Sequence, residues 1–97
     1  MPFLDRLLGL RAEIRAAAAA SGARDVRVFG SVARGEERPE SDVDVLVELE
    51  PGRTLFDLAT LEERLERLVG RPVQVTTARA LREPVRRAAE HDAVRVT

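Results

Sequence analysis

Residues 29–48 read FGSVARGEERPESDVDVLVE, and this stretch decides the fold. It starts at the end of one strand pattern, because residues 26–29 alternate and are rich in β-branched side chains. Gly30-Ser31 breaks that strand, and a short helical turn and a polar loop follow. Residues 43–49, VDVLVEL, then carry the strongest strand pattern of the chain. The stretch therefore predicts two strands joined by a turn, a short helix and a loop.

The second of these strands has two different faces, because side chains two residues apart point the same way. One face is apolar and should lie on the core; it carries Val43, Val45, Val47 and Leu49. The opposite face carries Asp42, Asp44, Leu46 and Glu48. Two aspartates are thus expected side by side at the start of the strand, on the face turned away from the main core.

Helical patterns flank this centre on both sides. Residues 2–20 have apolar side chains at helical spacing and are predicted as one amphipathic helix. Thr54 is predicted to cap a second helix, with Asp57 three residues on as an imperfect capping box and Gly70 as the stop. The run 62–67 within it, EERLER, is interpreted as a solvated face with helix charge pairs.

The end of the chain alternates once more between strand and helix. Residues 73–76 predict a third strand, and residues 81–90 a final helix with Pro84 in its first turn. Residues 94–96 are expected either to form a small terminal strand or to fray. We therefore expect an α/β (α+β) fold: a mixed sheet of three to four strands with helices packed mainly on one face. A single domain should span residues 1–97.

Composition narrows the class of protein. The chain has 97 residues and a net charge of −1, so nonspecific nucleic-acid binding is disfavoured. It has three Phe and no Trp or Tyr, which is few for stacking on single-stranded bases. The absence of Cys excludes disulfides and thiolate metal sites. No run approaches a membrane span or a signal peptide, so a cytoplasmic protein without membrane contact is the expectation.

Asp42 and Asp44 are the candidate catalytic and metal-ligating residues. Two carboxylates on one strand face can converge on one cation, and Mg²⁺ prefers oxygen ligands that it shares with water and substrate phosphates. Two such ions could clamp the attacking and leaving oxygens of phosphoryl transfer. Gly30 would let the backbone approach a ligand, and the N–H groups and hydroxyl at Ser31 could donate to a phosphate. Arg34 could reach a phosphate oxygen or pair with Glu36 or Glu37.

The combination Gly-Ser, Ala-Arg-Gly and Ser-Asp-x-Asp within residues 29–48 resembles the DNA polymerase beta-like nucleotidyltransferase superfamily. The length and element order are similar to its minimal nucleotidyltransferase branch. The resemblance implies that Gly30 and Ser31 hold a nucleoside triphosphate, ATP, and that Asp42 and Asp44 bind Mg²⁺. It also implies transfer of a nucleoside monophosphate to an acceptor with release of pyrophosphate. The acceptor expected from this branch is a hydroxyl of a HEPN-type toxin, with this chain as the antitoxin.

One position departs from the family pattern. The family places a third carboxylate on the next strand over, and Gln74 stands at that position here. A glutamine offers a carbonyl oxygen but no charge and cannot act as a general base. Two functions stay open: an enzyme that transfers the nucleotide, or a weak or inactive domain that neutralises its partner by binding alone. Transfer to a small molecule is less favoured because no second domain for such a substrate is evident.

Overall fold

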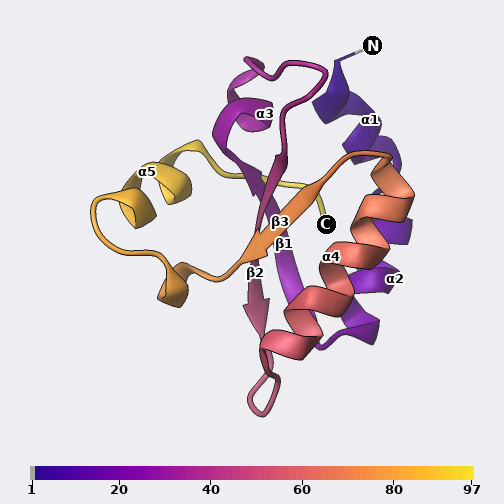
Figure 1. Ribbon diagram of the computed structural model, residues 1–97, viewed down its shortest axis with the longest axis vertical. Helices are drawn as coiled ribbons and strands as arrows, with labels where there is room; N and C mark the ends of the chain where they lie inside the picture. The colour runs from indigo at the N-terminus through magenta and orange to yellow at the C-terminus, as the bar shows by residue number, and fades with distance from the viewer. Residues whose placement is uncertain (1) are drawn as a thin grey trace.

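A four-stranded sheet forms the centre of the computed structural model, which describes residues 2–97. The strands are β1 (Ala23–Phe29), β2 (Val43–Leu49), β3 (Val73–Thr76) and β4 (Val94–Arg95), in the order β3-β2-β1-β4. Strand β1 runs antiparallel to β2 and β4, whereas β2 and β3 are parallel. The predicted mixed sheet is confirmed, and the terminal segment does form a short strand (Figure 1).

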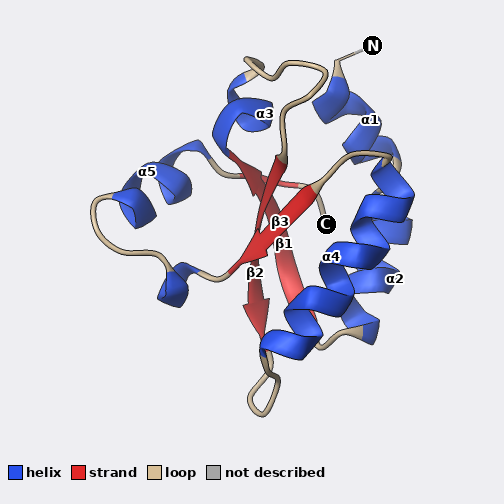
Figure 2. Cartoon of the chain, in the orientation of Figure 1, coloured by secondary structure: helices blue, strands red, loops and turns tan. Residues whose placement is uncertain are grey.

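Three helices cover one face of the sheet (Figure 2). They are α1 (Phe3–Gly9), α2 (Arg11–Ala20) and α4 (Leu55–Val69). The single helix expected over residues 2–20 is wrong, because the chain breaks at Leu10, whose backbone has φ −100° and ψ 11°. Gly9 weakens the helix at this point, and the Leu10 N–H bonds back to the carbonyl of Leu7 in a tighter turn. The break divides the segment into two separate helices, α1 and α2.

The core lies between these helices and the apolar face of the sheet. Val43, Val45 and Val47 of β2 are buried on it, as the alternation predicts. Leu46 points to the other face but is also fully buried, with 0% exposure. That face is covered by a second, smaller layer, in which α3 (Gly30–Arg34) and a 3₁₀ turn, η1 (Ala78–Ala80), contact β2 while α5 (Val85–Asp92) contacts β1. The sheet is therefore covered on both faces, more heavily on one.

The last helix begins later than predicted. Instead of a helix over 81–90, the chain forms η1 and then α5. The Thr77 hydroxyl accepts a hydrogen bond from the Ala80 N–H at 3.3 Å, which favours a separate short turn. Pro84 stands before α5 as its N-terminal cap, not within its first turn. Proline disfavours a helical backbone at the residue before it, so the helix starts only after Pro84.

Helix α4 is tied to the sheet through its charged residues as well as its leucines. Its capping box is present: the Thr54 hydroxyl accepts from Phe56 N–H, and the Asp57 carboxylate accepts from Thr54 N–H at 2.8 Å. Glu62 and Glu66 were expected on a solvated face. Their carboxylates instead accept the backbone N–H groups of Val75 and Val73, each at 2.9 Å. Helical periodicity does not predict these two hydrogen bonds, because it does not show which acidic residue faces the edge of a sheet.

Within residues 2–97, no helix combines the length and apolar character that crossing a membrane requires.

Candidate functional site

The Gly30-Ser31 turn lies directly against the start of β2. Phe29, the last residue of β1, pairs with Asp44 across the antiparallel ladder. Gly30 has φ +71°, and a Cβ built there would lie 2.6 Å from the Asp44 Oδ2. Any side chain at this position would therefore be strained and would displace the carboxylate. Because glycine has no side chain, the turn and the Asp44 carboxylate can lie close together. Ser31, the second residue of α3, is half-buried beside them.

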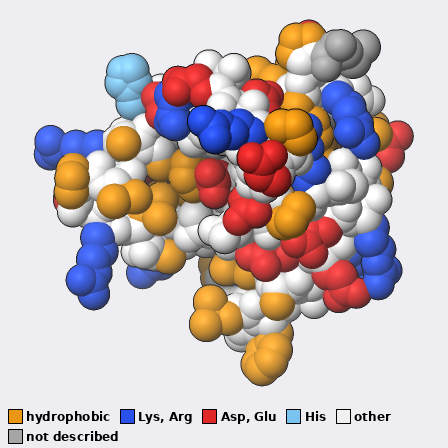
Figure 3. Space-filling model, turned by 45° about the horizontal axis from the view of Figure 1, so that its top comes forward, with side chains coloured by type: hydrophobic (Ala, Val, Ile, Leu, Met, Phe, Trp, Pro, Cys, Tyr) orange, Lys and Arg blue, Asp and Glu red, His pale blue; other side chains and the backbone are white. Residues whose placement is uncertain are grey.

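Asp42 and Asp44 form an acidic pair at this turn. Asp42 is exposed just before β2 begins, and Asp44 is half-buried on the strand. Burial raises the pKa of Asp44, the neighbouring charge of Asp42 raises it further, and Arg34 lowers it. Figure 3, which brings the α3 end of the molecule forward, shows acidic side chains gathered beside basic ones. The pair carries more negative charge than its surroundings neutralise, and a bound cation would relieve this.

Gln74 lies beside the pair on the neighbouring strand. In the parallel ladder it is the partner of Asp44, so it lies next to the acidic pair on the adjacent strand. Its side-chain Nε2 donates a hydrogen bond to Asp42 Oδ2 at 3.1 Å. The amide therefore holds Asp42 in place and leaves the position without a third negative charge.

Arg34 makes two side-chain contacts, of which one was predicted from the sequence. Its Nε donates to Glu36 at 3.1 Å, one of the alternatives expected for it. Its Nη1 donates to Asp92 of α5 at 2.8 Å, a partner 58 residues away. The hydrogen bond to Asp92 raises the pKa of the guanidinium above its ordinary value, so Arg34 stays charged. No local pattern marks Asp92, because only the fold brings α5 beside α3.

The donor set suits a hard divalent cation that completes its shell elsewhere. Within residues 2–97, no group of three or more His, Cys, Asp or Glu side chains is placed to hold a metal ion. The site offers two carboxylates, from Asp42 and Asp44, flanked by the Gln74 amide. Mg²⁺ is commonly bound by one or two carboxylates together with water and substrate phosphates. The residues therefore fit a cation that arrives with a phosphorylated ligand better than a dedicated metal cage.

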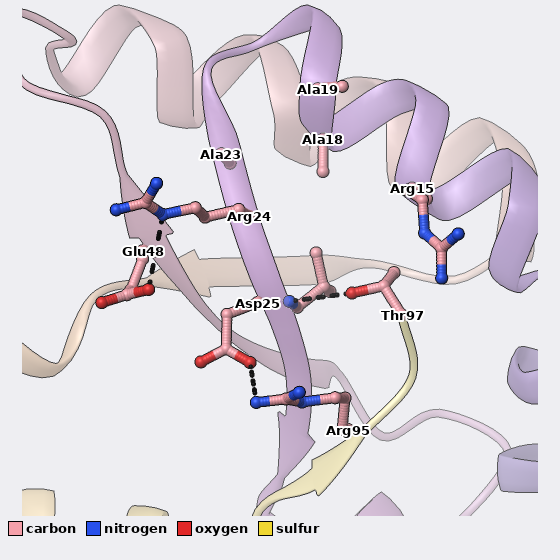
Figure 4. A pocket seen from close by; sticks show the side chains of 10 residues that line it. Arg15, Ala18, Ala19, Ala23, Arg24, Asp25, Glu48, Arg95 and Thr97 are labelled. Carbon is pink, nitrogen blue, oxygen red and sulfur yellow. Dashed lines mark hydrogen bonds and ion pairs between the residues drawn. The ribbon is translucent and has the colours of Figure 1, made fainter.

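A separate hollow lies at the opposite end of β1, between that strand, α2 and the chain end (Figure 4). Its volume is about 510 Å³, and none of the predicted site residues lines it. Asp25, on its wall, has φ 54° and lies 2.7 Å from Arg95 Nη2. This ion pair resembles Arg34–Asp92 in length but lies at the other end of the strand.

Substituting Asp44 should stabilise the metal-free protein at neutral pH. A raised folded-state pKa means that the fold binds the Asp44 proton more tightly than the unfolded chain does. Stability is therefore lost as the pH rises from the ordinary value of 3.8 through the raised one. We expect Asp44→Asn to gain about 0.5–2 kcal/mol at pH 7, the usual range for relieving such charges.

Urea unfolding in EDTA at several pH values measures this gain. The advantage of Asp44→Asn should shrink as the pH falls through the raised pKa of folded Asp44, and it should be lost below the ordinary value of 3.8, where the carboxyl is protonated in both states. Glu48→Gln is the control, because Glu48 is on the same face of β2 but is 59% exposed and paired with Arg24. An Asp44→Asn variant that is less stable than wild type at pH 7 would contradict the expected charge strain.

The fold and the site define a small α/β protein with an acidic pair beside a Gly-Ser turn, the arrangement expected of nucleotidyl transfer. A family model described as the nucleotidyltransferase domain matches residues 11–96. The chain belongs to this nucleotidyltransferase family, and the resemblance inferred from residues 29–48 is confirmed.

Relatives place it among minimal members of the family. It is 37% identical to the protein adenylyltransferase MntA of Thermococcus cleftensis over 75 residues, which are 77% of this chain and 76% of that protein. It is 43% identical over 56 residues to a candidate protein adenylyltransferase of Methanocaldococcus jannaschii, covering 58% of this chain and 60% of that relative.

Two solved structures share the fold. One is described as a candidate minimal nucleotidyltransferase; it has a TM-score of 0.83 and 42% identity, and the match covers 97% of this chain and 95% of that one. The other is a toxin-antitoxin crystal structure with AMP-PNP, with a TM-score of 0.75 and coverage of 90% and 72%. At 15% identity, the second supports the fold alone.

Proposed function

We propose that this domain binds Mg-ATP at the Gly30-Ser31 turn and the Asp42–Asp44 pair and transfers AMP to a hydroxyl group of a HEPN-type toxin partner. The close approach of the Asp44 carboxylate to Gly30, where a Cβ would lie 2.6 Å from Oδ2, carries the proposal, since it brings the turn that would hold phosphates next to the carboxylates that would hold the cation. The names of the relatives, protein adenylyltransferases, support AMP as the transferred group. One structure with this fold is a toxin-antitoxin complex, and by analogy with it we propose that this chain also binds a protein partner.

Each residue has a defined task in this reaction. Ser31 and the first N–H groups of α3 would hold the phosphates, and Arg34 would add a positive charge. Asp42 and Asp44 would hold Mg²⁺, which when bound neutralises charge on the phosphates and on the departing pyrophosphate. The acceptor oxygen attacks the α-phosphorus, the bond from that phosphorus to the β-phosphate bridge breaks, and pyrophosphate leaves. The hydroxyl proton passes to solvent, because Gln74 cannot accept it.

A second function is favoured by one observation. Gln74 occupies the position beside Asp44 and donates to Asp42, so the chain itself supplies no base there. A domain of this kind could neutralise its partner by covering it, with Mg-ATP bound but not consumed. Under that function the chain is an antitoxin by contact alone.

Phosphorus NMR of ATP and Mg²⁺ with the chain, in the presence and absence of its HEPN-type partner, separates the two functions. Pyrophosphate formed only with the partner, together with a mass gain of one AMP on that partner, supports transfer. Binding of Mg-ATP without turnover, and neutralisation of the partner that needs no nucleotide, supports covering. If the chain binds no Mg-ATP at all, the proposed nucleotide site is wrong.

A further inference from the structure

Helix α5 packs beside α3, and an ion pair joins it to the candidate site. Asp92, its last residue, accepts from Arg34 Nη1 at 2.8 Å, and both side chains are partly exposed, at 25% and 44%. Ala89, one turn earlier, is 4% exposed and is buried where α5 packs in the second layer against β1 and α3. The carboxylate therefore comes from a helix packed on the sheet, whereas Arg34 lies at the end of a helix of only five residues.

Two acceptors set the orientation of the Arg34 guanidinium. Glu36 takes the Nε hydrogen and Asp92 takes one from Nη1. Within residues 2–97, Nη2 makes no hydrogen bond, so this edge of the planar group is available to another acceptor. The positive charge of Arg34 also lowers the pKa of Asp44, so the guanidinium is near enough to the acidic pair to interact with it electrostatically. A guanidinium held on two sides has less rotamer freedom to lose when a phosphate binds.

We propose that Asp92 is a positioning residue that holds the Arg34 guanidinium ready for a phosphate group of the bound nucleotide. This inference rests on the proposed Mg-ATP site and names a residue of α5 that serves it. Asp92 touches no reacting atom in this scheme; it acts through Arg34. The C-terminal helix thereby becomes part of the nucleotide site, although it contributes no ligand of its own.

The test compares two aspartates in matched ion pairs. Asp92→Asn should weaken Mg-ATP binding about tenfold in calorimetry, because the acceptor loses the negative charge that strengthens its hydrogen bond with Arg34. Asp25→Asn is the control: Asp25 is 22% exposed and lies 2.7 Å from Arg95 Nη2, away from the turn. Asparagine tolerates its φ of 54°. The control should bind Mg-ATP like wild type, and both variants should lose similar thermal stability.

Two further variants separate positioning from mere folding. Asp92→Glu keeps the charge and should restore affinity to within about threefold of wild type. Glu36→Gln, at a side chain 64% exposed, leaves the fold intact and should weaken binding about threefold through the Nε contact. Equal affinities of wild type and Asp92→Asn, or tighter binding by Asp92→Asn, would overturn the inference while leaving the nucleotide site in place. If the wild-type chain binds no Mg-ATP, both the proposed nucleotide site and the positioning role of Asp92 are wrong.

Discussion

Replacing Asp42 and Asp44 together by asparagine should lower pyrophosphate release at least about a thousandfold, which corresponds to about 4 kcal/mol of barrier. The variant keeps the shape of both side chains but removes the two charges that would hold Mg²⁺ beside the phosphates. Loss of that cation removes several kcal/mol of charge stabilisation from the transition state. The rate is measured by phosphorus NMR or a coupled pyrophosphate assay with the partner present.

The control for this double variant is Glu48→Gln, four residues further along the same face of β2. Glu48 pairs with Arg24 at 3.5 Å and should leave the rate within about twofold of wild type. Full activity in the double variant would rule out Asp42 and Asp44 as the cation ligands. The same variant also tests the alternative function, since an antitoxin that acts by covering should still bind and neutralise its partner. A folded, partner-bound variant that fails to neutralise would exclude covering alone.

Replacing Gln74 by aspartate should raise the transfer rate about a hundredfold, the lower range of what a positioned general base contributes. The register carries this expectation, because Gln74 is the ladder partner of Asp44 on the adjacent strand. A carboxylate there adds charge for the cation and a group that can take the acceptor proton. The added charge should also lower stability in EDTA, since it joins an acidic pair already under strain.

Gln74→Asn is the matched control for this change. It has the same size as the aspartate variant but no charge, so it separates loss of the glutamine contact to Asp42 from gain of a base. Aspartate should be faster than asparagine at pH 7, and the difference should shrink at acid pH as the new carboxylate is protonated. Equal rates in the two variants would show that the missing third carboxylate does not limit turnover.

The parts of the fold that were predictable depend on local pattern. The strand at residues 43–49 and the strand at 73–76 have the predicted bounds, because alternation with β-branched residues is a strong local signal. The same alternation predicted Asp42 and Asp44 on one face of the strand, whereas the pairing of Gln74 with Asp44 is known only from the structure. The Thr54 capping box was also visible, since its two partners lie within three residues.

The features that were missed depend on contacts between distant segments. The helix breaks at Leu10, directly after Gly9, although the helical spacing of apolar residues continues through this position. Asp92 lies beyond the helix predicted over residues 81–90, and only the packing of α5 beside α3 brings its carboxylate to Arg34. Leu46 lies on the face opposite the main core, as the alternation predicts, but it is buried there by a second layer to which η1 and α5, far along the chain, contribute together with the nearby α3.

The carboxylates of Glu62 and Glu66 bear on how this chain can associate with others. Strand β3 is an edge of the sheet, and its outward N–H groups at Val73 and Val75 would otherwise be free to pair with a foreign strand. Side chains of α4 occupy both. The opposite edge, β4, has only two residues. Two N–H groups of β3 are thus already bonded and β4 offers only two residues, so we expect neither edge of the sheet to accept a strand from another chain.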